Sequence, residues 1–216
     1  MDESRARAGL AWAARRLDEL GLNHNASGNL SVRVGADLLV TPSGIPADRL
    51  DPADMVRLDL DGAPNNPDSR APTSEWRLHT ALAARRPEAG AIVHTHSVEA
   101  TAAATLGMAL PALHYVVARF GTNGLRCAPY ATYGSAELAD AVTDTLGDDA
   151  TACLMANHGA IALAPDLDDA VALALDVEWF CSVVRRARAH GDPIVLDDDE
   201  LTRVATRLRT YGQPPP

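Results

Sequence analysis

The stretch Ala91-Ile92-Val93-His94-Thr95-His96 runs from an apolar segment directly into a pair of histidines. Such a run is typical of a short buried β-strand that ends in polar residues. Because successive side chains of a strand point to opposite faces of the sheet, we expect His94 and His96 to share one face while Thr95 points away. Imidazole nitrogens are common zinc ligands, so the stretch offers half of a metal site. Taken alone, a His-x-His pair on a strand is more often structural.

The basic residues restrict the chemistry that such a site can support. All 19 of them are arginine, and the chain contains no lysine. Carbon–carbon lyases that work without a metal usually form a Schiff base with a lysine side chain. That route is closed here, so any carbonyl chemistry must rely on a metal or on another electrophile.

The composition describes an acidic globular chain of 216 residues, with a formal net charge of −10 and a hydrophobic fraction of 47%. These values predict one domain over residues 1–216 with a sizeable core. The acidic charge is spread over the whole chain, which argues against nucleic acid and against an anionic membrane surface as partners. No signal peptide or long apolar run is evident, so we expect a cytoplasmic protein in which Cys127, Cys153 and Cys181 are reduced thiols.

Hydrophobic periodicity predicts helices that alternate with short strands. The predicted helices span residues 4–20, 73–86, 97–106, 134–146, 167–189 and 199–209, and the predicted strands span 29–34, 37–41, 55–60, 91–96 and 152–156. Thr73 or Ser74 is expected to cap the helix that begins there, and residues 127–130 are expected to be irregular. A mixed sheet covered by helices, an α/β sandwich, fits this order best.

Further metal ligands must come from elsewhere in the chain. His158 follows the predicted strand 152–156 and precedes a glycine at which the backbone is expected to turn, and Glu75 lies at the start of a predicted helix. Each has an ordinary alternative explanation, since a turn histidine and an acid at a helix N-terminus need no ligand. His79 follows Glu75 by one helical turn, so these two could instead pair with each other. The other histidines look non-ligating from their context; they are His24, His114 and His190.

Three short segments are rich in small residues and backbone donors, namely Ser27-Gly28-Asn29, Ser43-Gly44 and Thr73-Ser74. Backbone N–H groups at glycine turns and helix starts bind phosphate, and hydroxyl groups add further donors. Ordinary turn and cap chemistry would explain each segment taken alone. Neither a GxxxxGK[ST] loop nor a GxGxxG loop follows a strand, which disfavours a nucleotide site.

Motifs over nearly the whole chain resemble the class II aldolase/adducin family, and most closely its L-fuculose-1-phosphate aldolases. The resemblance rests on these motifs, in chain order: Gly21-Leu22-Asn23, Ser27-Gly28-Asn29-Leu30-Ser31-Val32-Arg33, Thr41-Pro42-Ser43-Gly44-Ile45-Pro46, Pro72-Thr73-Ser74-Glu75-Trp76-Arg77, Val93-His94-Thr95-His96, Pro111-Ala112-Leu113-His114-Tyr115, Cys127-Ala128-Pro129-Tyr130-Ala131-Thr132-Tyr133-Gly134, His158-Gly159 and Thr210-Tyr211-Gly212. The implied fold is a single-domain α/β/α sandwich whose central mixed sheet is mostly antiparallel.

The resemblance also implies roles for individual residues. It implies one zinc ion per subunit, held by His94, His96 and His158, with Glu75 as fourth ligand or catalytic base. Phosphate contacts are implied for the following residues: Gly28, Asn29, Ser43, Gly44, Thr73 and Ser74. Tyr133 is implied to line the pocket, and two catalytic tyrosines are implied to reach the site of a neighbouring subunit in a homotetramer: Tyr115 and Tyr211.

The implied reaction is the reversible cleavage of a ketose 1-phosphate, best L-fuculose 1-phosphate, to dihydroxyacetone phosphate and an aldehyde such as L-lactaldehyde. The same metal set also fits a pentulose-phosphate 4-epimerase, a methylthioribulose-1-phosphate dehydratase or a sugar-acid-phosphate decarboxylase. A non-catalytic adducin-like scaffold is the alternative from another class. The chain departs from the aldolase pattern at Asn25-Ala26-Ser27, where we expect one phosphate-binding hydroxyl to be shifted by a residue. It also departs at Arg119-Phe120, which we expect near the mouth of the site.

Overall fold

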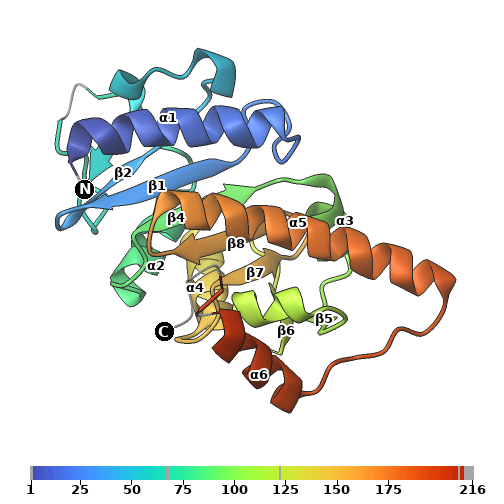
Figure 1. Cartoon of the computed structure of the whole chain (residues 1–216). Helices are drawn as coiled ribbons and strands as arrows, with labels where there is room; N and C mark the ends of the chain where they lie inside the picture. Colours follow the sequence, from blue (N-terminus) through green and yellow to red (C-terminus); the bar gives the residue numbers. More distant parts are fainter. Residues whose placement is uncertain (1, 67–68, 122, 209, 212–216) are drawn as a thin grey trace.

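The computed structural model of the chain describes residues 2–66, 69–121, 123–208 and 210–211, which form a central sheet covered by helices (Figure 1). The helices are α1 (Glu3–Glu19), α2 (Trp76–Arg85), α3 (Val98–Ala104), α4 (Ala136–Leu146), α5 (Leu167–His190) and α6 (Asp198–Leu208), with short 3₁₀ turns η1 (Ala47–Arg49), η2 (Pro52–Asp54) and η3 (Tyr115–Phe120). The strands are β1 (Asn29–Val34), β2 (Asp37–Val40), β3 (Val56–Leu58), β4 (Ala91–Thr95), β5 (Leu110–Pro111), β6 (Gly124–Ala128), β7 (Ala152–Met155) and β8 (Gly159–Ala164).

The eight strands form one sheet in the order β3-β2-β1-β4-β8-β7-β6-β5. Strands β6 and β7 are parallel, and every other neighbouring pair is antiparallel. This arrangement confirms an α/β fold with a mixed, mostly antiparallel sheet. All described strands join this sheet, and the single domain over residues 1–216 stays a prediction.

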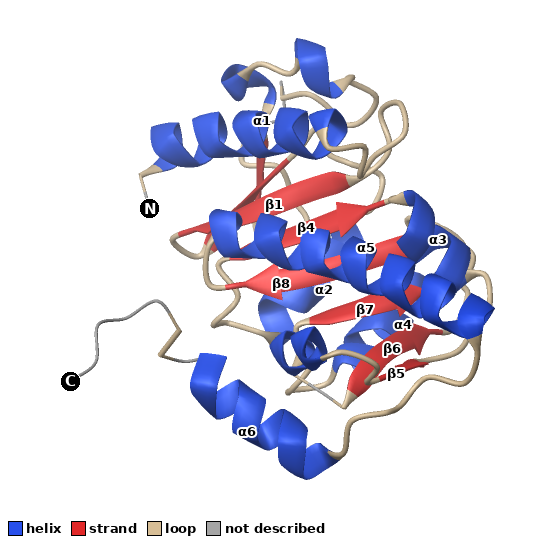
Figure 2. Ribbon diagram, turned by 45° about the vertical axis from the view of Figure 1, so that its right-hand side comes forward, coloured by secondary structure: helices blue, strands red, loops and turns tan. Residues whose placement is uncertain are grey.

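Helices cover both faces of the sheet (Figure 2). Helices α1, α3 and α5 pack on one face, and α2 and α4 pack on the other. Residues of β4 alternate between the two faces: Val93 belongs to the core beneath α1 and α5, and Ile92 belongs to the core beneath α2 and α4. The same alternation turns His94 toward α2, and this decides on which face the site is built.

The predicted helices agree with the structure to within a few residues, but the start of α2 differs. Glu75, and not Thr73 or Ser74, is the N-cap residue of α2, and its side chain makes no capping bond. The reason is that the preceding segment is held extended: the Thr73 N–H donates to the carbonyl oxygen of Thr41, and Pro42 bridges to Pro72. The Glu75 side chain is buried, and its carboxylate lies beside His94 and not on the backbone of α2.

The strands differ from prediction more than the helices do. The strand predicted over 55–60 is shortened to β3, because the Asp59 carboxylate accepts from the backbone N–H groups of Asp61 and Ala63 and closes a turn. The irregular segment predicted over 127–130 is wrong in its first half, since Cys127 and Ala128 belong to β6. Strand β8 is absent from the prediction because it is buried on both faces and shows no apolar–polar alternation.

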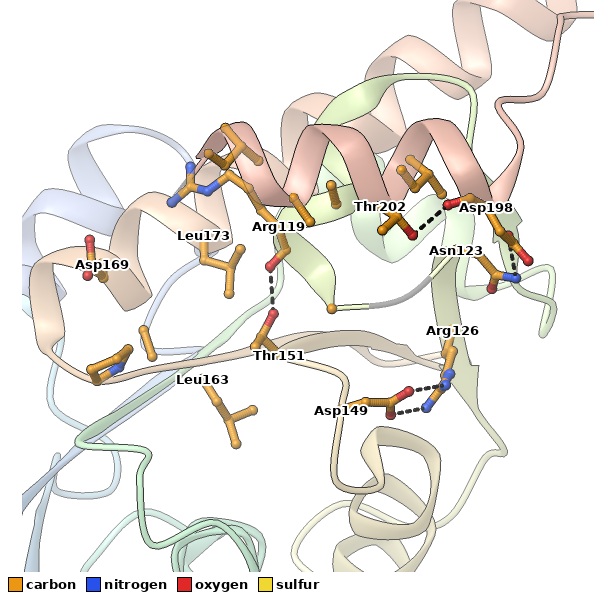
Figure 3. A pocket seen from close by; sticks show the side chains of 17 residues that line it. Arg119, Asn123, Arg126, Asp149, Thr151, Leu163, Asp169, Leu173, Asp198 and Thr202 are labelled. Atoms are coloured by element: carbon orange, nitrogen blue, oxygen red, sulfur yellow. Dashed lines mark hydrogen bonds and ion pairs between the residues drawn. The ribbon is translucent and has the colours of Figure 1, made fainter. Parts of the chain in front are cut away.

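A large hollow of ≈ 860 Å³ lies between α6, η3 and the sheet (Figure 3), and it contains none of the residues predicted for the site. Arg119 lines this hollow and pairs with Asp176, while Phe120 is buried in the core against Phe180. The expectation that Arg119-Phe120 lies near the mouth of the site is therefore wrong within this chain. Arg126 also lines the hollow, but its guanidinium already binds both carboxylate oxygens of Asp149.

The described part of the chain contains no helix with the combined length and apolar character needed to cross a bilayer. The three cysteines are free thiols.

Candidate metal centre and active site

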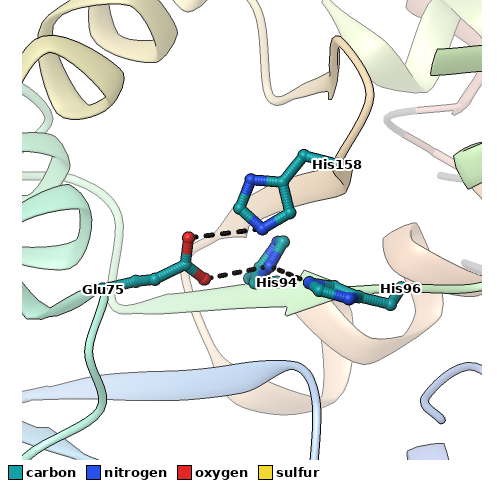
Figure 4. A group of neighbouring side chains, drawn as sticks. All are labelled: Glu75, His94, His96 and His158. Carbon is teal, nitrogen blue, oxygen red and sulfur yellow. Dashed lines mark hydrogen bonds and ion pairs between the residues drawn. The ribbon is translucent and has the colours of Figure 1, made fainter. Parts of the chain in front are cut away.

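Four side chains from distant parts of the sequence converge at one end of the central strands: Glu75, His94, His96 and His158 (Figure 4). One candidate ligand atom from each lies within 4.8 Å of all the others. The Nε2 atom of His94 lies 2.9 Å from Nε2 of His96 and 3.0 Å from Oε2 of Glu75. Nε2 of His158 lies 3.4 Å from Oε1 of Glu75. The histidine pair thus shares one face, as the strand geometry predicted.

These separations suit a divalent ion with nitrogen and oxygen ligands. Tetrahedral zinc, with bonds of about 2.0–2.2 Å, places neighbouring ligand atoms about 3.3–3.6 Å apart. Oε1 of Glu75 is buried without a hydrogen-bond partner in the described structure, which leaves it available to a cation. Nδ1 of His94 lies 2.9 Å from the carbonyl oxygen of Ala160, so this nitrogen carries a proton, and in the neutral, metal-binding form of the ring Nε2 presents its lone pair to the cluster.

The turn between β7 and β8 delivers His158 to the cluster. Asn157 adopts a left-handed conformation with φ of 54°, and it makes the turn that was expected at the glycine. Gly159 has a different role. A Cβ at this position would lie 2.3 Å from the carbonyl oxygen of Thr95, so only glycine permits β8 to approach the end of β4 this closely.

The electrostatics of the cluster favour a negative carboxylate among mostly neutral imidazoles. Burial raises the pKa of Glu75, but the adjacent imidazole of His94 outweighs it and holds the pKa well below its usual range. Burial opposes the charged form of His94, yet the nearby Glu75 carboxylate raises its pKa overall. Burial, together with the charge on His94, lowers the pKa of His96 and of His158 to about 4 each. Neutral imidazoles and an ionised carboxylate are the forms in which these groups bind metals.

A second row of polar side chains lies directly behind Glu75. The amide nitrogen Nδ2 of Asn29 donates to Oε2 of Glu75 at 3.0 Å, while Oδ1 of Asn29 lies 2.6 Å from Nε2 of His79. Nδ1 of His79 in turn lies 2.8 Å from the hydroxyl of Ser31. The alternative pairing of His79 with Glu75 is therefore wrong. One sequence signal could have indicated this row, the spacing of Asn29 and Ser31 on one face of a predicted strand.

A cleft of ≈ 130 Å³ opens onto this cluster. It is lined by all of the residues expected to contact substrate, together with three members of the cluster: Gly28, Asn29, Ser43, Gly44, Thr73, Ser74, Tyr133, Glu75, His96 and His158. In the described structure, the backbone N–H groups of Gly28, Gly44 and Ser74 have no acceptor within the protein. Asn29 lines the cleft, but its amide is also committed to Glu75 and His79.

The tyrosines expected at the site lie in different surroundings. Tyr133 borders the cleft and is 68% exposed, and the adjacent Gly134 packs closely on the backbone of Ser74. Tyr115 and Tyr211 do not line the cleft of their own chain, and they are 53% and 86% exposed. Their contribution to the site of a neighbouring subunit stays a prediction.

The other histidines and the altered segment before β1 have surroundings of their own. His114 is apart from the cluster and packs against the rings of Tyr115 and Trp179. His24 and His190 are also outside the cluster. The Ser27 hydroxyl accepts from the backbone N–H of His24, so the altered Asn25-Ala26-Ser27 segment uses this hydroxyl to close its own turn.

Comparison with known proteins agrees with this geometry. Residues 8–184 match the family described as Class II Aldolase and Adducin N-terminal domain. The chain is 44% identical over 206 residues to the 5-methylthioribulose-1-phosphate/5-deoxyribulose-1-phosphate aldolase of Rhodospirillum rubrum, a match that covers 95% of this chain and 92% of that protein. It is 40% identical over 197 residues to the L-fuculose phosphate aldolase of Escherichia coli K12, covering 91% and 90%. A solved structure of an L-fuculose 1-phosphate aldolase superposes with a TM-score of 0.91 at 34% identity, covering 97% of this chain and 98% of the other.

The chain therefore belongs to the class II aldolase and adducin family. It is an enzyme of the aldehyde-lyase type, and the cluster of three histidines and one glutamate supports a metal-dependent reaction.

Proposed function

We propose that the protein is a zinc-dependent aldolase that reversibly cleaves a ketose 1-phosphate to dihydroxyacetone phosphate and an aldehyde. One observation carries this proposal. The buried cluster of Glu75, His94, His96 and His158 opens into a cleft. The other wall of this cleft carries hydroxyl groups and backbone N–H groups that have no acceptor among the described residues. Since the chain has no lysine, a Schiff-base mechanism with a side-chain amine is closed to it.

The three histidines would hold the zinc ion, with Glu75 as the fourth ligand when no substrate is bound. When bound, the ion supplies Lewis-acid stabilisation of the negative charge that develops on the ketose oxygens as the carbon–carbon bond breaks. Zinc is favoured over harder cations because three of the four ligands are imidazoles.

The phosphate group would be held without a formal positive charge, because the chain has no lysine and no arginine of the described residues lines the cleft. The N–H groups of Gly28, Gly44 and Ser74 and the hydroxyls of Ser43 and Thr73 offer donors to it. The N-terminus of α2 lies beside them and adds a favourable dipole. This grip fixes the sugar so that its reacting carbons face the cluster.

Proton transfer would be divided between two groups. Glu75 gives a proton to the carbon of dihydroxyacetone phosphate in the cleavage direction and removes it in the synthetic direction, through the oxygen that lacks a hydrogen-bond partner. Tyr115 of a neighbouring subunit, with Tyr211, would exchange the proton of the aldehyde oxygen in a homotetramer. The 53% exposure of the Tyr115 ring in the single chain is compatible with such a role.

The names of the relatives indicate three candidate substrates. L-fuculose 1-phosphate, 5-deoxyribulose 1-phosphate and 5-methylthioribulose 1-phosphate would each release dihydroxyacetone phosphate when the bond between the third and fourth carbons breaks. The aldehydes would be lactaldehyde, acetaldehyde and methylthioacetaldehyde, each with a methyl or thioether end. We keep L-fuculose 1-phosphate as the first candidate and a cytoplasmic location as the expected one.

The test is to incubate the zinc-loaded protein with each sugar phosphate and to couple dihydroxyacetone phosphate to NADH oxidation. We expect zinc-dependent NADH loss with at least one of the three. Epimerisation, loss of water or loss of carbon dioxide without dihydroxyacetone phosphate would favour the epimerase, dehydratase or decarboxylase instead. A protein that binds no stoichiometric zinc and turns over none of them would fit the adducin-like scaffold.

A further inference from the structure

Ser31, His79 and Asn29 form a row of hydrogen bonds behind the metal cluster. This row ends on Oε2 of Glu75. We propose that His79 is a positioning residue, which acts through the side-chain amide of Asn29 to engage Oε2 of Glu75 and leave Oε1 for the reaction. This inference deepens the proposed function and rests on it, because it assigns the residue that prepares the carboxylate of the same site.

The row exists because the spacings of a helix and a strand match. Glu75 and His79 are four residues apart at the start of α2, a rise of about 6 Å. Asn29 and Ser31 are two residues apart on β1, a rise of about 6.6–6.8 Å. The helix pair and the strand pair therefore stay in step, so that His79 lies between Ser31 and Asn29 while Glu75 meets Asn29.

The partners of His79 fix the position of its ring proton. The amide nitrogen Nδ2 of Asn29 donates to Glu75, so the amide oxygen Oδ1 is the atom that faces His79. An amide oxygen can only accept a hydrogen bond, so Nε2 of His79 must carry the proton. Nδ1 of His79 then accepts from the hydroxyl of Ser31. The opposite tautomer would place two acceptors face to face at 2.6 Å.

This proton position makes the two carboxylate oxygens of Glu75 different from each other. If Asn29 rotated its amide by half a turn, its carbonyl oxygen would face the carboxylate and repel it. The N–H of His79 prevents this rotation, so Nδ2 stays on Oε2. Oε1 is thereby left as the oxygen without a hydrogen bond, facing His158 at 3.4 Å.

Water has little access to these bonds. The side chains of His79 and Ser31 are fully buried, and Asn29 is 7% exposed. A missing donor in this row would thus stay unreplaced, and loss of such an outer partner typically costs 10–100-fold in metal affinity or activity.

Three variants test the proposal. His79→Phe keeps the ring but removes both nitrogens, His79→Gln keeps an N–H that donates and an oxygen that accepts, and Thr80→Val is a matched control on the same helix. The hydroxyl of Thr80 bonds only to the carbonyl oxygen of Arg77 and is outside the row. We expect His79→Phe to lower kcat about 10–100-fold at nearly constant KM and to weaken zinc binding by a similar factor. His79→Gln should recover most of both, and Thr80→Val should change neither.

A merely structural role for His79 would give a different result. His79→Phe would then lower the unfolding midpoint while leaving kcat per bound zinc and zinc affinity unchanged, which would overturn the proposal. Equal losses in His79→Gln and His79→Phe would also overturn it. Zinc affinity, measured by competition with a chelator, needs no substrate. It therefore separates failure of this proposal from failure of the proposed aldolase activity.

One measurement needs no variant, and it decides the matter if His79→Phe does not fold. Long-range proton–nitrogen NMR correlations of the unsubstituted protein report which nitrogen of each imidazole carries hydrogen. We expect His79 to be neutral with its proton on Nε2. A proton on Nδ1 would contradict the row as described.

Discussion

Gly159 and Thr95 approach each other so closely that a Cβ on Gly159 would lie 2.3 Å from the carbonyl oxygen of Thr95. This contact joins the start of β8 to the end of β4, where Thr95 pairs with Ala160. His158 immediately precedes the contact, and His94 and His96 flank the Thr95 side of it. The glycine thus lets two separate segments bring their histidines within reach of one ion.

Gly159→Ala should therefore damage both stability and metal binding. The added methyl group forces the two backbones apart, and overpacking of this kind typically costs about 1–3 kcal/mol in the free energy of unfolding. Urea denaturation and zinc titration measure the two effects. Gly9→Ala is the matched control, because its new Cβ meets only a methyl of Leu167 at 3.3 Å and its helix favours alanine. Equal behaviour of the two variants would show that the close approach is unimportant.

Removal of one imidazole should abolish the metal centre. We expect the unsubstituted protein to bind one zinc ion per chain and His158→Gln to lose tight binding, because the ion would keep only two histidines and a carboxylate. His190→Gln is the control, since His190 lies at the exposed end of α5. Elemental analysis after gel filtration gives the stoichiometry. Full retention of zinc by His158→Gln would remove His158 from the ligand set.

Glu75→Gln should separate metal binding from proton transfer. The amide keeps the shape of the carboxylate and leaves all three histidines in place, so the variant should still bind zinc and remain folded. It cannot move a proton, and general acid–base groups typically contribute about 10²–10⁴-fold to the rate. The check is kcat for cleavage of the ketose 1-phosphate at full zinc occupancy. A variant with undiminished kcat would refute the role of Glu75 as the base.

The pH dependence of stability should reveal the buried neutral His79 in the zinc-free protein. Burial lowers the pKa of His79 to about 3, whereas an unfolded histidine has a pKa of about 6.5. Between these values only the unfolded chain binds the proton, so the free energy of unfolding falls as the pH drops below about 6.5. At about pH 5 this single group should destabilise the folded state by about 2 kcal/mol relative to neutral pH.

His79→Gln removes that proton uptake and supplies the comparison. The free energy of unfolding of the variant should fall less than that of the unsubstituted protein between about pH 7 and pH 5, as measured by urea denaturation in the presence of a chelator. The other histidines of the cluster are common to both proteins and cancel in the difference. Parallel pH profiles would mean that His79 is not kept neutral by the fold.

Local periodicity and chemically distinctive residues are the features that the sequence predicts well. The alternation around His94 and His96 determines their common face, and the absence of lysine by itself excludes a Schiff base with a side-chain amine. Helices such as α1 and α5 are predicted almost to their ends, because their apolar residues repeat with the helical period. Residue chemistry offers Glu75, His158 and the donor-rich segments as candidates, and motif resemblance implies their roles.

Local pattern does not reveal β8, which is apolar on both faces, nor the left-handed Asn157 that turns the chain toward the site. It also does not reveal that His79 bonds to Asn29 and Ser31 and not to Glu75. These features depend on which atoms from distant segments meet: the carbonyl of Thr95 against Gly159, and Asn29 between Glu75 and His79. A residue's own neighbours along the chain determine its preferred backbone conformation and face, whereas its hydrogen-bond partners are chosen by the packing of the whole sheet. The sequence alone therefore determined the chemistry that is available, and the tertiary structure decided how each group is oriented and which oxygen of Glu75 is left free.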